Sequence, residues 1–257
     1  KKFGSFTALD NVTCTIPEGC IYGMVGSNGA GKSTLLRLIS GVYRPDAGEV
    51  LIDGEPVWEN ETVKAQIGFV PDELYFLSGA SMTRMAELYK AAFPRFDQKR
   101  FRELADAFGL DTKKSIGTFS KGMKKQLSVI LGLCSRTRYL LCDETFDGLD
   151  PHKKELLKNI LLEYINETSA SVIIASHDLT EIAGVCDRVA ILNGKNVILD
   201  SNIDDISDLY RKVALTFEMP VTEQTFKGVN YRNLKLSGRN VYMTIFGDID
   251  KETQKLK

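Results

Sequence analysis

Residues 21–40 read IYGMVGSNGAGKSTLLRLIS, and this stretch decides the fold class. The apolar run 21–25 leads directly into a glycine-rich segment, after which Leu35, Leu36 and Ile39 recur at helical spacing. The pattern predicts a strand, a glycine-rich loop and a helix, in that order.

The glycine-rich segment has the spacing G-x-x-x-x-G-K-S/T. Glycines let such a loop wrap closely enough for its backbone N–H groups to bind phosphate oxygens, and the helix N-terminus adds a favourable dipole. In this pattern Lys32 reaches the β- and γ-phosphates, and the hydroxyl of Ser33 ligates Mg²⁺. We therefore predict a nucleotide site with Mg²⁺ and a catalytic role for Lys32; the alternative is a glycine-rich turn that matches by chance. The predicted loop comprises Gly26, Ser27, Asn28, Gly29, Ala30, Gly31, Lys32, Ser33 and Thr34.

A second apolar run ends in two adjacent carboxylates. Residues 139–142 read YLLC and are followed by Asp143 and Glu144. Residues that follow a buried strand of a parallel sheet face the crevice where ligands bind. We predict that Asp143 ligates Mg²⁺ and that Glu144 is the base that polarises the attacking water. The competing interpretation is a strand that simply stops at a polar turn.

Two further segments place these motifs in one sheet. The runs 139–142 and 172–175 read as strands, and between them a helix is expected over 152–166, with Asp150 as its N-cap and Pro151 at its first position. The order strand, helix, strand predicts a parallel sheet.

The rest of the chain predicts additions to this sheet. Alternating side chains over 12–16 and short apolar runs at 49–52 and 66–70 predict further strands. Helical spacing between about 78 and 136 predicts a mostly helical insertion. The predicted fold class is α/β: a P-loop NTPase parallel-sheet core with an antiparallel β subdomain, the helical insertion and a small C-terminal α+β appendage. We expect a nucleotide-binding domain over 1–200 and the appendage over 201–257.

Composition limits the partners. The 257 residues include 33 lysines and arginines against 34 aspartates and glutamates, a net charge of −1, which lacks the basic excess of a nucleic-acid-binding protein. No apolar run reaches the roughly 18 residues of a membrane span. The five cysteines form no C-x-x-C pair, which favours a reducing compartment. We expect a cytoplasmic protein with no nucleic-acid partner.

With three more elements, the sequence resembles the ATP-binding subunits of ABC transporters over about residues 3–200. The first is the segment 119–123, FSKGM, which lies where the family carries its LSGGQ-type signature and matches it at Ser120 and Gly122. A serine N-cap and a glycine at a helix start make an anion site. The resemblance implies that these residues bind the γ-phosphate of a nucleotide held by another subunit; the alternative is a plain helix cap.

The other two elements follow the paired carboxylates. Residues 148–150, GLD, resemble the family's D-loop at the dimer seam. His177 follows the predicted strand 172–175 and resembles the switch histidine that contacts the γ-phosphate and orients water. The alternative for His177 is a structural or solvated histidine.

Two positions are assigned by the resemblance alone. Phe3 resembles the aromatic residue that stacks on adenine, with Phe6 as an alternative and a packed apolar side chain as the other interpretation. Asp72 lies where the family usually has the Q-loop glutamine, and we expect it to hold Mg²⁺ through water. The alternative for Asp72 is a solvated turn residue after Pro71.

The resemblance implies a complete function. The chain is expected to bind ATP with Mg²⁺ and to pair head to tail with a second ABC subunit, identical or different, so that each composite site joins one glycine loop to the other subunit's Ser120 segment. It would drive a separate, export-type membrane permease from the inner face of the cell membrane. Three classes compete: a soluble cassette ATPase not coupled to transport, a small-molecule kinase or GTPase, and a phosphate-binding module without turnover.

Overall fold

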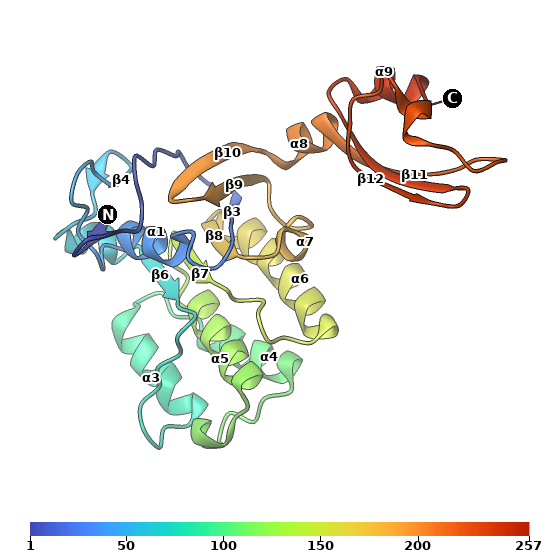
Figure 1. Ribbon diagram of the computed structural model, residues 1–257. Coiled ribbons are helices and arrows are strands. Elements are labelled where there is room, and N and C mark those ends of the chain that lie inside the picture. The colour runs from blue at the N-terminus through green and yellow to red at the C-terminus, as the bar shows by residue number, and fades with distance from the viewer. Residues whose placement is uncertain (257) are drawn as a thin grey trace. The chain divides into compact units, whose positions relative to one another are not determined.

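The structure is a computed structural model that describes residues 1–256. The chain divides into two compact units, Lys1–Asp200 and Ser201–Lys257, and Figure 1 labels many of their helices and strands. In the part of the chain described, no helix combines the length and the apolarity needed to cross a membrane.

A six-stranded sheet organises the larger unit. Its strands, in spatial order, are β10 (Asn196–Asn202), β9 (Arg188–Asn193), β3 (Ile21–Val25), β8 (Ser171–Ser176), β7 (Tyr139–Asp143) and β6 (Ile67–Val70). From β9 to β6 all neighbouring strands are parallel. Asp143 of β7 pairs with Ala175 of β8, and Ser176 pairs with Val25 of β3. The carboxyl ends of β3, β7 and β8 therefore meet at one edge of the sheet.

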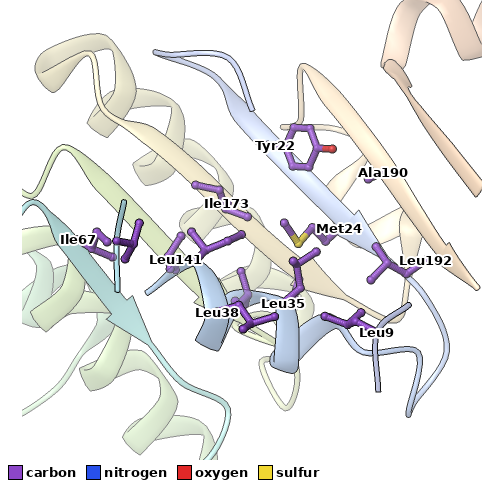
Figure 2. Close-up of a cluster of buried hydrophobic side chains, with 14 of the residues drawn as sticks. Leu9, Tyr22, Met24, Leu35, Leu38, Ile67, Leu141, Ile173, Ala190 and Leu192 are labelled. Carbon is purple, nitrogen blue, oxygen red and sulfur yellow. The ribbon is translucent and has the colours of Figure 1, made fainter. Parts of the chain in front are cut away.

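Helix α1 (Lys32–Ile39) packs against one face of this sheet. Figure 2 shows Leu35 and Leu38 lying between the helix and the strand residues Met24, Leu141 and Ile173. Burial of these apolar side chains stabilises the packing of α1 on the sheet. It thereby holds the start of α1 close to the end of β3, with the glycine loop between them.

Two helices follow the central strands. Helix α6 (Pro151–Thr168) follows β7, and the short helix α7 (Leu179–Ile182) follows β8. Asp150 caps α6, because its Oδ1 accepts a hydrogen bond from the N–H of Lys153 at 2.9 Å. The helix expected over 152–166 is therefore present and slightly longer.

The insertion between residues 78 and 136 is helical. It contains α3 (Met82–Ala92), α4 (Gln98–Phe108) and α5 (Lys121–Cys134), which are labelled in Figure 1. The 3₁₀ turn η1 (Ile116–Thr118) lies between α4 and α5, and a four-residue helix, α2 (Glu61–Lys64), precedes the insertion. Side chains of Ser81, Asp97 and Ser120 cap the three longer helices. Helix α5 contacts both α4 and the strands β6 and β7, so it joins the insertion to the sheet.

The antiparallel β part is smaller than predicted. It consists of two hairpins, β1 (Lys2–Phe3) with β2 (Phe6–Thr7) and β4 (Leu51–Ile52) with β5 (Glu55–Pro56). The strand predicted over 12–16 is wrong. Val12 and Ile16 do pack against the core, but this segment pairs with no strand among the described residues. The alternation of apolar residues in this segment therefore reflects burial of their side chains and does not indicate pairing with another strand.

The unit after residue 200 is an α+β structure with its own core. Its strands β11 (Tyr210–Thr216), β13 (Asn240–Phe246) and β12 (Tyr231–Ser237) form an antiparallel sheet in that order. Helix α8 (Ile203–Leu209), the 3₁₀ turn η2 (Glu223–Phe226) and helix α9 (Ile249–Gln254) complete it. Val241, Met243 and Ile245 pack with Phe226.

Candidate MgATP site

The loop between β3 and α1 has a backbone that only glycine adopts easily. Gly29 and Gly31 have φ angles of 82° and 101°. A Cβ on Gly31 would lie 2.5 Å from Leu9 Cδ2 and 2.9 Å from the carbonyl oxygen of Ala8. Gly31 is also the N-cap of α1 and supplies no side-chain cap. The first N–H groups of α1 therefore have no side-chain cap, and they can donate hydrogen bonds to an anionic ligand.

Lys32 is buried beneath this loop, with 5% of its surface exposed. Its Nζ donates to the carbonyl oxygens of Gly26 at 2.7 Å and Ser27 at 3.3 Å. The same nitrogen lies 3.2 Å from Glu144 Oε1. The Glu144 carboxylate thus neutralises the buried charge of Lys32.

Ser33 and Asp143 form the second part of the site. The Ser33 hydroxyl donates to Asp143 Oδ1 at 3.0 Å. Asp143 is fully buried, and no donor among the described residues reaches its Oδ2. Burial raises the pKa of Asp143, an effect that the Ser33 hydrogen bond opposes and that the charges of Asp72 and Glu144 reinforce.

These two residues fit Mg²⁺. A buried carboxylate oxygen without a donor, next to a serine hydroxyl, is a hard-oxygen donor set. Mg²⁺ commonly takes only one or two protein ligands and completes its shell with water and substrate phosphates. Ser33 and Asp143 would hold the cation, which would also supply the positive charge that Asp143 lacks.

Asp143→Asn should raise the thermal stability of the nucleotide-free protein while lowering hydrolysis. Because the folded-state pKa of Asp143 is raised, its ionised form costs stability, and this cost grows as pH rises through that pKa. The neutral amide removes the cost, so we expect the midpoint of thermal unfolding to rise by about 2–4 °C at pH 7. Mg²⁺-dependent ATP hydrolysis should fall about 100-fold or more. A lower midpoint in calorimetry would contradict this account of Asp143.

Glu144 connects the loop to the end of the next strand. Its Oε2 lies 2.9 Å from His177 Nδ1 and accepts a hydrogen bond from the backbone N–H of His177 at 3.3 Å. Glu144 has a φ angle of 48°, a strained conformation for a residue with a side chain. The structure thus brings together Lys32, Glu144 and His177, the three residues for which the sequence predicts catalytic roles.

Glu144 also sets the protonation of His177. The hydrogen bond to Glu144, together with the charge of that carboxylate, raises the pKa of His177 above its usual value. The pairing of protonated His177 with Glu144 therefore stabilises the fold below the usual pKa of histidine. This stabilisation is lost as pH rises through the raised pKa of His177.

Glu144→Gln should lower the pKa of His177 toward its usual value. The chain has only two histidines, so NMR titration of their ring protons resolves each one. His152, which lies at the start of α6, is the internal control. An unchanged His177 pKa in Glu144→Gln would show that Glu144 is not the cause.

Ser120 and Gly122 begin α5. The Ser120 hydroxyl oxygen accepts a hydrogen bond from the N–H of Met123 at 3.2 Å. A Cβ on Gly122 would lie 3.0 Å from the carbonyl oxygen of Gly148, so this glycine permits close contact with the segment 148–150. No hydrogen bond or ion pair of the described residues joins the Ser120 segment to loop 26–34 of the same chain.

Phe3 and Asp72 have partners of their own. The ring of Phe3 packs edge-on against Tyr43 at 5.3 Å between centroids, and Lys1 Nζ lies 5.4 Å from the centre of the same ring. Asp72 Oδ1 accepts a hydrogen bond from Lys125 Nζ at 2.9 Å. Sequence reasoning missed Lys125, although helical spacing places it on the same face of α5 as the buried Val129 and Gly132.

The arrangement defines a class of protein. A glycine loop before a helix, a buried lysine beneath it and a serine–aspartate pair at the strand ends form a nucleoside-triphosphate site of the P-loop type.

Comparisons with known proteins name the family. A family model described as ABC transporter matches residues 9–147. The ABC transporter ATP-binding protein YtrB of Bacillus subtilis (strain 168) is 30% identical over 213 residues, which is 83% of this chain and 73% of that protein. The methionine import ATP-binding protein MetN of Caulobacter vibrioides is 28% identical over an alignment of 265 positions, which covers 97% of this chain and 80% of that protein.

Comparison with solved structures points to the same family. An ATP-binding subunit of an ABC transporter matches with a TM-score of 0.72 and 25% identity, over 80% of this chain and 88% of that one. The cbiO1 protein from Clostridium perfringens, described as part of the ABC transporter complex cbiONQ, matches with a TM-score of 0.64 and 26% identity, over 77% of this chain and 83% of that one. The chain belongs to the ABC transporter family.

The resemblance inferred from the motifs is thereby confirmed, and so are the P-loop NTPase fold class and the enzyme class. The protein is an ATP-binding subunit whose ATP hydrolysis is coupled to transport. This sets aside the uncoupled ATPase, the kinase or GTPase, and the module without turnover.

Proposed function

We propose that this chain binds ATP with Mg²⁺ through loop 26–34, Ser33 and Asp143, and that Glu144 orients the attacking water. The observation that carries the proposal is the position of the Glu144 carboxylate. It lies between Lys32 and His177, at the sheet edge where Asp143 and Ser33 meet. Bound Mg²⁺ would neutralise phosphate charge as the leaving group departs.

Nucleotide binding would rearrange the charges of the site. Lys32 must exchange the carboxylate of Glu144 for the β- and γ-phosphates. That exchange frees one oxygen of Glu144 to accept a proton from water, while His177 keeps the other oxygen in place. Catalysis then rests on positioning and on charge stabilisation.

We infer that the working form is a head-to-tail pair of ABC subunits, identical or different. Ser120 and Gly122 would bind the γ-phosphate held by the partner's loop. Their contact with segment 148–150, and the lack of a hydrogen bond to their own loop, support this assignment. The Ser120 side chain caps α5, and the free N–H groups of the first turn would face the anion. We keep Phe3 as the proposed adenine contact, with its exposed ring available for stacking.

The membrane partner is a separate permease, and the chain would work at the cytoplasmic face of the membrane. The exposed Tyr75 and the flanking segment 73–77 after Pro71 offer acidic and aromatic groups to a permease helix. The relative cbiO1 is described as part of a transporter complex, which supports a multi-subunit arrangement.

Export is the direction proposed from the sequence, and import is the second candidate. The match to a methionine import protein extends over 97% of this chain, including the unit after residue 200, and this favours import. Transport by the purified complex, measured in vesicles of both orientations, decides between them.

The central experiment compares hydrolysis of MgATP by the chain alone and with its co-purified permease. We expect basal hydrolysis that the permease stimulates and that Glu144→Gln removes. Hydrolysis by Glu144→Gln at the parent rate would refute the assigned role of Glu144.

A further inference from the structure

A buried lysine of the helical insertion forms an ion pair with the carboxylate that follows β6. Lys125, on α5, is 0% exposed. In residues 1–256 its ammonium donates only to Asp72, to Oδ1 at 2.9 Å and to the carbonyl oxygen at 3.4 Å. A buried charge is costly unless a partner of opposite sign neutralises it. Asp72 is therefore the group that makes the burial of Lys125 tolerable.

The pair lies beside the MgATP site. Strand β6 ends at Val70, which pairs with Cys142 of β7, the residue before Asp143. Asp72 follows β6 by two residues, and α5 approaches β6 so closely that a Cβ on Gly132 would lie 2.5 Å from Val70 Cγ2. The ion pair thus joins the backbone after β6 to α5.

We propose that Lys125 and Asp72 are a positioning pair that anchors α5, and with it the Ser120 segment, to the edge of the sheet that holds Asp143. In this arrangement Asp72 is the counter-ion of Lys125 and not a Mg²⁺ ligand. An ammonium group 2.9 Å from Oδ1 opposes the approach of a second cation to that oxygen. The inference rests on the MgATP site proposed above.

Lys125 and Asp72 differ in burial, and the proposal therefore predicts different losses of stability when each of them is replaced. The Asp72 side chain is 44% exposed, so water can solvate it when Lys125 is removed. Lys125 cannot be solvated when Asp72 is removed. Loss of Asp72 should therefore destabilise the protein more than loss of Lys125, and removing both charges should restore stability.

The first measurement is thermal unfolding without nucleotide. Asp72→Ala should lower the midpoint by roughly 10 °C, and Lys125→Met by roughly 3 °C. The double variant should return to within about 3 °C of the parent. Lys124→Met, next on the helix and without a side-chain ion pair among the described residues, is the control and should change little. Additive losses in the double variant, or an unchanged midpoint in Asp72→Ala, would overturn the pairing, whatever becomes of the MgATP site.

The second measurement separates positioning from stability and from metal binding. In the double variant we expect kcat for ATP hydrolysis to stay about 10-fold low, with KM for ATP and the half-saturating Mg²⁺ concentration within about two-fold of the parent. A kcat that recovers with the unfolding midpoint would reduce the pair to a stabilising contact. A rise of about 10-fold in half-saturating Mg²⁺ in both Asp72→Ala and the double variant would make Asp72 a metal ligand and refute the proposal.

Discussion

Replacing Lys32 by alanine is expected to weaken MgATP binding about 100-fold or more, which leaves no measurable binding at micromolar nucleotide. Lys32 is the cation buried beneath loop 26–34, with its Nζ within 3.3 Å of two loop carbonyl oxygens and of Glu144. Alanine removes the charge-assisted contact with the phosphates, and no side chain in the loop replaces it.

Isothermal calorimetry with MgATP measures this loss. Lys99→Ala, which removes an exposed lysine on α4, is the matched control and should bind as the parent does. Thermal unfolding of both variants confirms that each is folded. Micromolar affinity in folded Lys32→Ala would remove the loop from the nucleotide site.

The parts of the site that sequence predicted are those set by local structure. The glycine loop, the start of α1 and the capped start of α6 depend on neighbouring residues, so spacing and residue type were sufficient. The strand ends at Asp143 and Ser176 were also predictable, because buried parallel strands read as continuous apolar runs. In a parallel sheet the carboxyl ends of neighbouring strands lie at the same edge, so the residues that follow them lie close together.

The parts that sequence did not predict depend on contacts between distant residues. Lys125 and Asp72 are 53 positions apart, and the type of neither residue indicates with which residue it pairs. The bridge from Lys32 through Glu144 to His177 likewise depends on how β7 and β8 align. The strand predicted over 12–16 failed for the same reason, since a strand needs a partner that the segment itself does not specify.

Glu144→Gln should slow hydrolysis about 100-fold or more and should make two subunits associate in MgATP. The amide is a poor base, so bound ATP persists and continues to join the loop of one subunit to the Ser120 segment of the other. The substitution also weakens the competition for Lys32, because a neutral amide replaces the carboxylate 3.2 Å from its Nζ. We therefore expect nucleotide affinity to rise as turnover falls, a combination that simple damage to the site does not produce.

Size-exclusion chromatography with saturating MgATP, beside a hydrolysis assay, tests both effects in one variant. If the partner cassette is a different protein, the same experiment is made with the co-purified partner. Glu103→Gln on α4 removes an exposed carboxylate and should behave as the parent. A Glu144→Gln variant that stays monomeric at saturating nucleotide, with its partner present, would contradict the composite site while leaving the catalytic role of Glu144 to the rate measurement. Because association and rate are read separately, the experiment shows whether Ser120 completes the site of another subunit or whether each chain hydrolyses ATP by itself.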